Sequence, residues 1–138
     1  MRTLILLTCP LVLGGCNLLM PRPDPGQAWI ELNPPAPRSL RATEVDHRKL
    51  DDHRYFQVPP GAHRLGMRYR FEVDASNIGP DSDAHERDCL IRLNYGKFAA
   101  GQRYSLEVGQ VGFRPWAKLY DAERRELARG KESGCKGA

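Results

Sequence analysis

The side chains best suited to bind a metal or move a proton lie in one polar stretch, residues 46–53 (DHRKLDDH). It holds two histidines and three aspartates, and imidazole and carboxylate groups are common ligands of Zn²⁺ and other divalent ions. The candidate metal ligands are therefore His47, Asp51 and His53. Two basic residues within the stretch and a third directly after it would repel a cation, and aspartate is a common turn residue. We expect an exposed hairpin here, without a metal or another cofactor, and keep a metal site as the alternative.

A catalytic group is harder to find. His63 follows a Pro-Gly pair on the apolar side of an alternating stretch, and as a base it would need a nucleophile and an orienting carboxylate. The sequence singles out neither, and it contains no Gly-x-Ser-x-Gly, His-Glu-x-x-His or phosphate-binding glycine loop. Asp81 and Asp83 lack the glycine and closing glutamate of a calcium loop. We expect His63 to bond to backbone near the turn, and we predict no catalytic residue.

The N-terminal residues are typical of an export signal. A positive start is followed by an apolar stretch, interrupted once by Pro10, and by Leu13-Gly14-Gly15-Cys16. A cysteine directly after Leu-Gly-Gly resembles a bacterial lipobox. The resemblance implies that residues 1–15 are a signal peptide, and that Cys16 is linked to diacylglycerol, becomes the first residue and is N-acylated. The alternatives are a buried N-terminal helix or a plain signal peptide with a chance cysteine.

Residues 16–27 are expected to form a lipidated, flexible tether, because three prolines and a glycine favour an extended chain. Three acyl chains would make the attachment effectively permanent. Asn17 stands where an aspartate would suggest retention at the inner membrane. By analogy with other bacterial lipoproteins, we expect a lipid-anchored protein of the cell envelope, at the outer membrane and facing the periplasm.

Cys89 and Cys135 remain once Cys9 leaves with the signal peptide and Cys16 takes the lipid. In an oxidising compartment they predict one disulfide. It would close a loop of about 46 residues and contribute roughly 3 to 4 kcal/mol. A redox pair or metal thiolates are the alternatives, but there is no Cys-x-x-Cys and no Cys–His spacing of a zinc site.

Composition limits the classes of protein that this chain could represent. Its 138 residues, 41% hydrophobic and 28% charged, suffice for one compact domain. No apolar run reaches the ~20 residues of a membrane-spanning helix. Without residues 1–15, which carry only Arg2, 20 basic residues stand against 17 acidic ones, a net charge of +3. No basic block supports nucleic-acid binding, but a mildly basic face could meet anionic lipid, lipopolysaccharide or peptidoglycan.

The rest of the chain reads as short strands joined by turns. Residues 62–73 alternate apolar and charged side chains over twelve positions, which predicts a long strand with one wet face. Further strands are expected at 28–32, 40–45, 54–58, 89–95, 102–108 and 116–120, an edge strand at 126–128, and a polar loop at 75–88. Seven to eight strands without a convincing helix predict an all-β fold. We expect a small antiparallel β-sandwich, Ig-like or prealbumin-like, over residues 28–138, with Tyr95, Tyr104 and Trp116 in its core.

Residues 45–47 (VDH) and 55–65 (YFQVPPGAHRL) resemble a PEGA-type surface domain, in which a Val-Asp-Gly hairpin precedes a Val-x-Pro-Gly-x-His-x-Leu turn and strand. Residues 98–104 and 117–121 resemble uncharacterised proteobacterial envelope lipoproteins of the same build. The match covers about half of the chain after the signal peptide, and His47 departs from it where the hairpin usually has glycine. The resemblance implies an all-β, surface-displayed module and no reaction.

One loop carries residues of the types enriched at binding hot spots: Phe113, Arg114 and Trp116. They are the candidate partner contacts, with core packing as the alternative. Together these features predict a non-catalytic binding or scaffolding module, whose partner is an envelope protein complex or a polysaccharide and not nucleic acid. The main alternative is a periplasmic metal-binding protein or small hydrolase that uses the cluster of His47, His53 and nearby carboxylates. A third possibility is an inhibitor or chaperone that pairs the 126–128 edge with a client strand.

Overall fold

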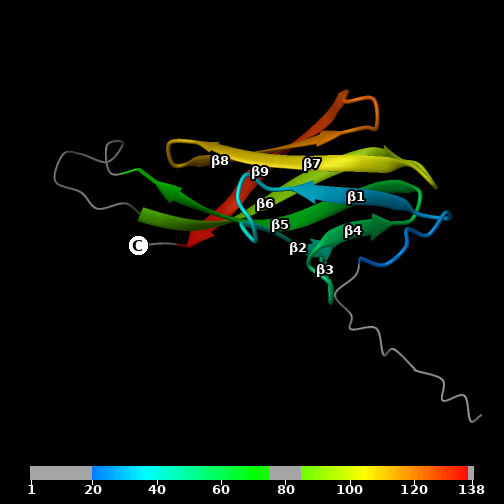
Figure 1. The fold of residues 1–138 in the computed structure, drawn as a ribbon, viewed down its shortest axis with the longest axis horizontal. Helices are drawn as coiled ribbons and strands as arrows, with labels where there is room; N and C mark the ends of the chain where they lie inside the picture. The colour runs from blue at the N-terminus through cyan, green and yellow to red at the C-terminus, as the bar shows by residue number, and fades with distance from the viewer. Residues whose placement is uncertain (1–19, 75–84, 137–138) are drawn as a thin grey trace, which may run out of the picture.

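The computed structural model describes residues 20–74 and 85–136. The predicted signal peptide, Cys16, Asp81 and Asp83 lie outside these ranges. The described residues form nine strands and no helix, so no helix among them could cross a membrane (Figure 1). The strands are β1 (Ala28–Asn33), β2 (Leu40–Val45), β3 (Arg48–Lys49), β4 (Tyr55–Val58), β5 (Gly61–Val73), β6 (His85–Phe98), β7 (Arg103–Val111), β8 (Arg114–Tyr120) and β9 (Glu126–Lys136).

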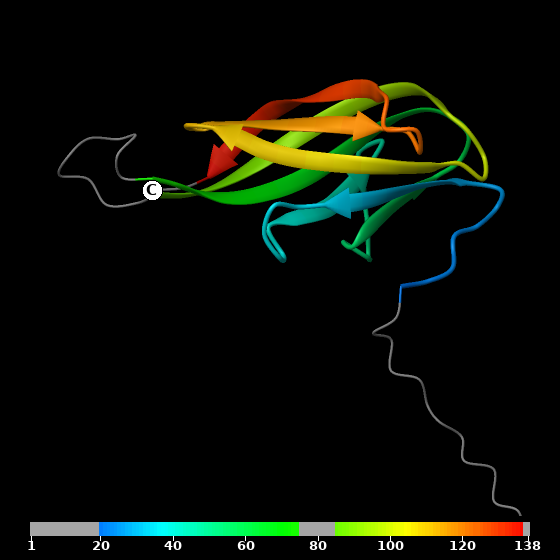
Figure 2. The same ribbon diagram turned by 45° about the horizontal axis from the view of Figure 1, so that its top comes forward.

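The strands form one sheet in the order β3-β2-β5-β6-β9-β8-β7-β1-β4. The sheet curls so that its two halves face each other across the core (Figures 1 and 2). The predicted all-β, sandwich-like fold is therefore confirmed, with nine strands instead of seven to eight. One pair departs from the predicted antiparallel pattern, because β1 lies between β4 and β7 and runs parallel to β7. This register aligns the inward-facing Ile30 with Tyr104.

Strand β9 joins the two halves of the sheet. Its residues 126–130 pair with β8, and its residues 131–136 pair with β6. The passage occurs at Gly130, where an added Cβ would lie 2.8 Å from Cγ2 of Ile91 and 3.0 Å from Cβ of Ala117. The edge strand predicted at 126–128 is the first part of this longer strand, where β8 is its one neighbouring strand among the described residues.

A second contact between the two halves of the sheet joins β2 to the segment that leads into β4. The backbone N–H of Ala42 in β2 donates to the carbonyl of His53 at 2.9 Å, and Nδ1 of His53 lies 2.7 Å from the carbonyl oxygen of Ala42. The N–H of Leu50 also donates to the carbonyl of Thr43. The chain between β3 and β4 therefore follows the outer edge of β2 before it enters the other half of the sheet.

The core consists of the inward-facing side chains of both halves. The alternation predicted for residues 62–73 is confirmed, because Leu65, Met67 and Tyr69 are buried while Arg68 and Arg70 face outward. Two expectations are wrong. Trp116 lies on the outer face, since the alternate residues of its strand, Pro115, Ala117 and Leu119, face inward. The last residues of the predicted 75–88 loop belong to β6, where they pair with the end of β5.

Candidate functional site

The turn between β7 and β8 presents two of the three exposed large apolar side chains among the described residues, and the third is Met20 near the N-terminal end. Val111 is 74% exposed and Phe113 is 39% exposed. Val111 pairs with Arg114 across a turn of two residues, and Gly112 takes the left-handed φ of 59°. We call residues 111–114 the β7–β8 tip. Because the two exposed apolar side chains lie within one turn, they make this turn the candidate contact surface.

The β7–β8 tip is held in place by β6. Nη1 of Arg87 donates to the carbonyl of Phe113 at 2.9 Å, and the guanidinium lies 5.5 Å from the centre of the Phe113 ring. A cation over an aromatic face is attracted by the ring quadrupole. Below the tip, the Tyr69 hydroxyl donates to the side-chain oxygen of Gln110. The exposed ring is therefore positioned by the neighbouring ribbon of β5 and β6.

Of the three predicted contact residues, the structure brings Phe113 and Arg114 together at the tip. Trp116 is two residues further along β8, where its ring covers Gly109 and Nζ of Lys118 lies 5.1 Å from the ring centre. Sequence reasoning missed Val111, although a valine at the far end of an alternating strand is the available signal. The tip thus keeps Phe113 and Arg114, adds Val111 and lacks Trp116.

The predicted metal ligands do not converge. Nδ1 of His53 contacts the carbonyl of Ala42, and Nε2 of His47 lies 3.3 Å from a guanidinium nitrogen of Arg64. Among the residues that the structure describes, only Cys89, Glu132 and Cys135 place three potential ligand atoms within 4.8 Å of one another. His47 therefore belongs to the turn and His53 to the junction at β2, and with the exposed Asp51 they form no ligand group.

Asp46 and His47 form the two-residue turn between β2 and β3. Both residues take left-handed φ values, 50° and 67°, which hairpin turns of this length require. The turn also contacts β5, because the N–H of Arg64 in that strand donates to Oδ1 of Asp46 at 2.8 Å.

His63 is a structural residue, bonded to backbone near the turn as predicted. Its Nδ1 lies 2.6 Å from Oδ2 of Asp46, and its Nε2 lies 2.8 Å from the carbonyl oxygen of Pro59. Both ring nitrogens thus face oxygen acceptors, and these two contacts hold the ring between the two turns. The hydrogen bonds from His63 and from the Arg64 backbone lower the pKa of Asp46 below its ordinary value.

Replacing Asp46 by asparagine is expected to lower the free energy of unfolding by about 1 kcal/mol at neutral pH. Asparagine tolerates the left-handed backbone, so the loss reports on the carboxylate charge. Because folding lowers this pKa, the stabilisation is present at pH values above about 4 and is lost as pH falls through the folded-state pKa. Urea unfolding curves of the two proteins should differ at neutral pH and converge in acid. The same change at the exposed Asp51 is the control, and an equal loss there would contradict this role of Asp46.

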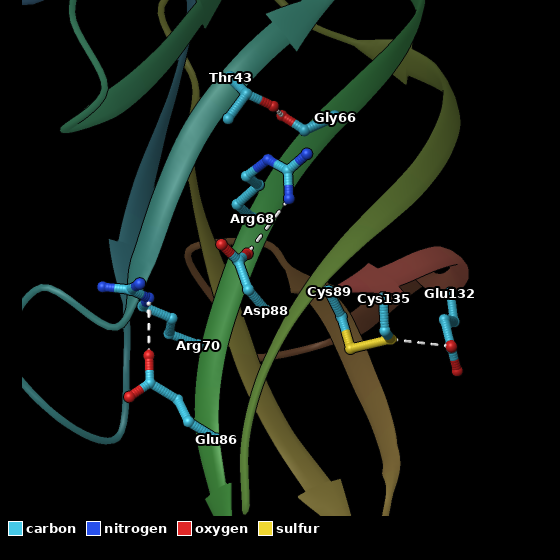
Figure 3. A network of polar contacts seen from close by, with 9 residues as sticks. All are labelled: Thr43, Gly66, Arg68, Arg70, Glu86, Asp88, Cys89, Glu132 and Cys135. Carbon is cyan, nitrogen blue, oxygen red and sulfur yellow. Dashed lines mark hydrogen bonds and ion pairs between the residues drawn. A yellow bond between two sulfur atoms is a disulfide. The ribbon is translucent and has the colours of Figure 1, made fainter. Parts of the chain in front are cut away.

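The predicted disulfide joins Cys89 of β6 to Cys135 of β9, which are directly opposite in register (Figure 3). Cys89 is fully buried, and the two sulfur atoms are bonded to each other. Since a disulfide sulfur has no thiolate to offer, the group with Glu132 is not a metal site. The disulfide has a structural role, because it links β9 covalently to β6.

Comparisons of the chain with protein-family models, curated proteins and solved structures found no match. The PEGA-type resemblance stays a prediction from the quoted residues.

Proposed function

We propose that this protein is a lipid-anchored, non-catalytic binding module of the bacterial cell envelope. The observation that carries the proposal is the exposure of Val111 and Phe113 at the β7–β8 tip. In Figure 1 the tip lies at the left-hand end of the domain, and residues 20–27 lie at its right-hand end. An anchor on the N-terminal side would leave the tip directed away from the membrane.

The anchor itself rests on the lipobox-like residues that end at Cys16. Part of the expected tether is held by the domain, because the N–H of Asp24 donates to the side-chain oxygen of Gln57 and that of Gly101 to the carbonyl of Gln27. The expected tether is thereby limited to residues 16–23. Fully extended, such a segment reaches roughly 25 Å, enough to cross the polar surface of a membrane and hold the domain close to it.

A protein partner fits the β7–β8 tip better than a polysaccharide. Sugar rings usually need open aromatic faces, whereas the aromatic rings on the outer face of β8 are accompanied by cations. Lys118 lies over Trp116, and the guanidinium of Arg124 lies 4.7 Å from the centre of the Tyr120 ring. A convex turn with one aromatic and one branched aliphatic side chain suits an apolar pocket of another envelope protein.

Site-specific crosslinking in living cells tests this proposal. With p-benzoylphenylalanine at Val111, irradiation is expected to give a discrete adduct with an envelope protein. The same residue at the exposed Lys97, at the opposite end of β6, should give none. Truncating an aromatic anchor costs about 2 kcal/mol or more at an interface, so Phe113→Ser should reduce the adduct severalfold. An adduct of equal yield from both positions would contradict a contact at the tip.

The anchor is tested in the same cells by the mass of the N-terminus. A triacylated Cys16 is expected in the parent protein, and no acyl mass is expected on the Cys16→Ala variant. An unmodified N-terminus would refute the anchor but leave the crosslinking result to decide whether the tip binds a partner.

A further inference from the structure

A hollow of about 570 Å³ lies where the chain passes from β1 into β2 and where it enters β4. A smaller hollow of about 180 Å³ adjoins it and shares three of its arginines. Leu32 and Leu40, which pack on the core, form the apolar side of the larger hollow. We call the combined surface the arginine groove, after the five arginines that line it: Arg38, Arg41, Arg54, Arg68 and Arg70.

The arginine groove carries more positive charge than its carboxylates balance. Three of its arginines form ion pairs. Arg54 pairs with Asp52 at 2.7 Å. Figure 3 shows the other two pairs, Arg68 with Asp88 at 3.3 Å and Arg70 with Glu86 at 3.1 Å. Arg38 and Arg41 are exposed and form no ion pair with any residue that the structure describes. Two guanidinium groups in the groove are thus free to bind an anion.

The backbone places these charges together. Arg41 in β2 is directly opposite Arg68 in β5, and like charges at opposed positions of an antiparallel pair destabilise it. Arg38 takes a left-handed φ of 62°, which few residues with a side chain adopt. The N–H of Arg70 donates to the carbonyl of Ser39 at 2.7 Å and holds this turn against β5. An arrangement that is unfavourable in the empty groove becomes favourable when an anion lies between the guanidinium groups.

We propose that the arginine groove binds a phosphate group attached to an apolar molecule, and that Arg38 and Arg41 are its main ligands. The fork of N–H donors on a guanidinium matches the oxygens of a phosphate. Leu32 and Leu40 would contact the carbon atoms next to that phosphate. The phosphate belongs either to a membrane phospholipid or to a soluble ester, and both have the chemistry that the groove offers. The inference deepens the proposed function, on which it rests for the envelope setting.

The test uses the full-length chain with Cys16→Ala, so that no acyl chain of its own competes. Calorimetric titration with dihexanoyl phosphatidic acid is expected to show binding. The double variant R38Q/R41Q should lose about tenfold or more in affinity, since it removes two charge-assisted contacts. The matched control R103Q/K131Q removes two exposed charges from β7 and β9 and should stay within about twofold. Thermal unfolding checks that both variants are folded.

Three further probes identify which part of the ligand is recognised. Inorganic phosphate and dihexanoylglycerol should each bind at least about tenfold more weakly, because each lacks one half of the ligand. Vesicles that contain phosphatidylglycerol then distinguish the sources: cosedimentation that depends on Arg38 and Arg41 assigns the bilayer, and binding of the short-chain lipid alone assigns a soluble ester.

Equal affinities of R38Q/R41Q and R103Q/K131Q, or equal binding of dihexanoylglycerol, would overturn the proposal. Such a result would leave the crosslinking at Val111 unaffected, because the arginine groove and the β7–β8 tip share no residue. The N-terminal apolar segment is common to all variants, so its own affinity for lipid cancels in the comparison. Binding through the groove should also weaken as salt is added, as expected for charges near the surface.

Discussion

Replacing Cys89 and Cys135 together by alanine is expected to lower the free energy of unfolding by about 3 to 4 kcal/mol. The disulfide closes a loop with a sequence separation of 46 residues, and removing it restores the conformational freedom of that loop in the unfolded chain. A domain of this size has a total stability of about 5–15 kcal/mol, so the loss is a large part of the whole. Urea unfolding of the parent and the double variant measures it.

The natural control is chemical reduction. Dithiothreitol should destabilise the parent protein by a similar amount and leave the double alanine variant unchanged. Hydrogen exchange should show the largest loss of protection in residues 131–136, because that part of β9 is held to β6 alone. If the double variant retained the stability of the parent, strand pairing and core packing would account for the position of β9 without the covalent bond.

Replacing Gly130 by valine is expected to cost about 3 kcal/mol, the second largest effect. A Cβ at this position would come within 3.0 Å of side chains from both halves of the sheet, Ile91 and Ala117. Both neighbours are buried, so the added atoms force a shift of packed side chains or of the backbone. The same urea titration detects the loss.

Gly96→Val in β6 is the matched control, because a Cβ there meets nothing within 4 Å. It should change stability by no more than about 0.5 kcal/mol, and a β-branched residue is well suited to a strand. Equal costs at the two glycines would show that loss of backbone freedom, and not the close approach at Gly130, sets the penalty.

The strands were predictable wherever side chains alternate. Leu65, Met67 and Tyr69 face the core as the period of two requires, and the pairing of Cys89 with Cys135 was predicted from the number of cysteines and the expected compartment. Pattern alone does not say which strands become neighbours. The parallel pair of β1 and β7 and the passage of β9 between halves depend on contacts between distant parts of the chain, which no local period encodes.

Only part of the candidate site was predicted, because its geometry also depends on contacts between distant parts of the chain. A loop with Phe113 and Arg114 could be selected by residue type, but the orientation of Trp116 depends on whether the strand begins with an inward or an outward residue. The polar stretch 46–53 suggested a metal because its histidines are close in sequence. In the fold, His53 closes the edge of β2 and His47 turns the hairpin, so they meet different neighbours. The arginine groove could not be predicted from the sequence, because its arginines come together only through the register of β2 against β5.

The parallel pairing of β1 with β7 has a mechanical consequence. If the chain is held by its N-terminus and a partner holds the β7–β8 tip, tension enters at the start of β1 and leaves at the end of β7. These strands lie side by side with five residue pairs in register, Trp29–Arg103 to Asn33–Glu107. The pull then runs along the strands and loads their ladder in shear, so that its hydrogen bonds must break together. A hairpin pulled apart at its open end would instead unzip one bond at a time.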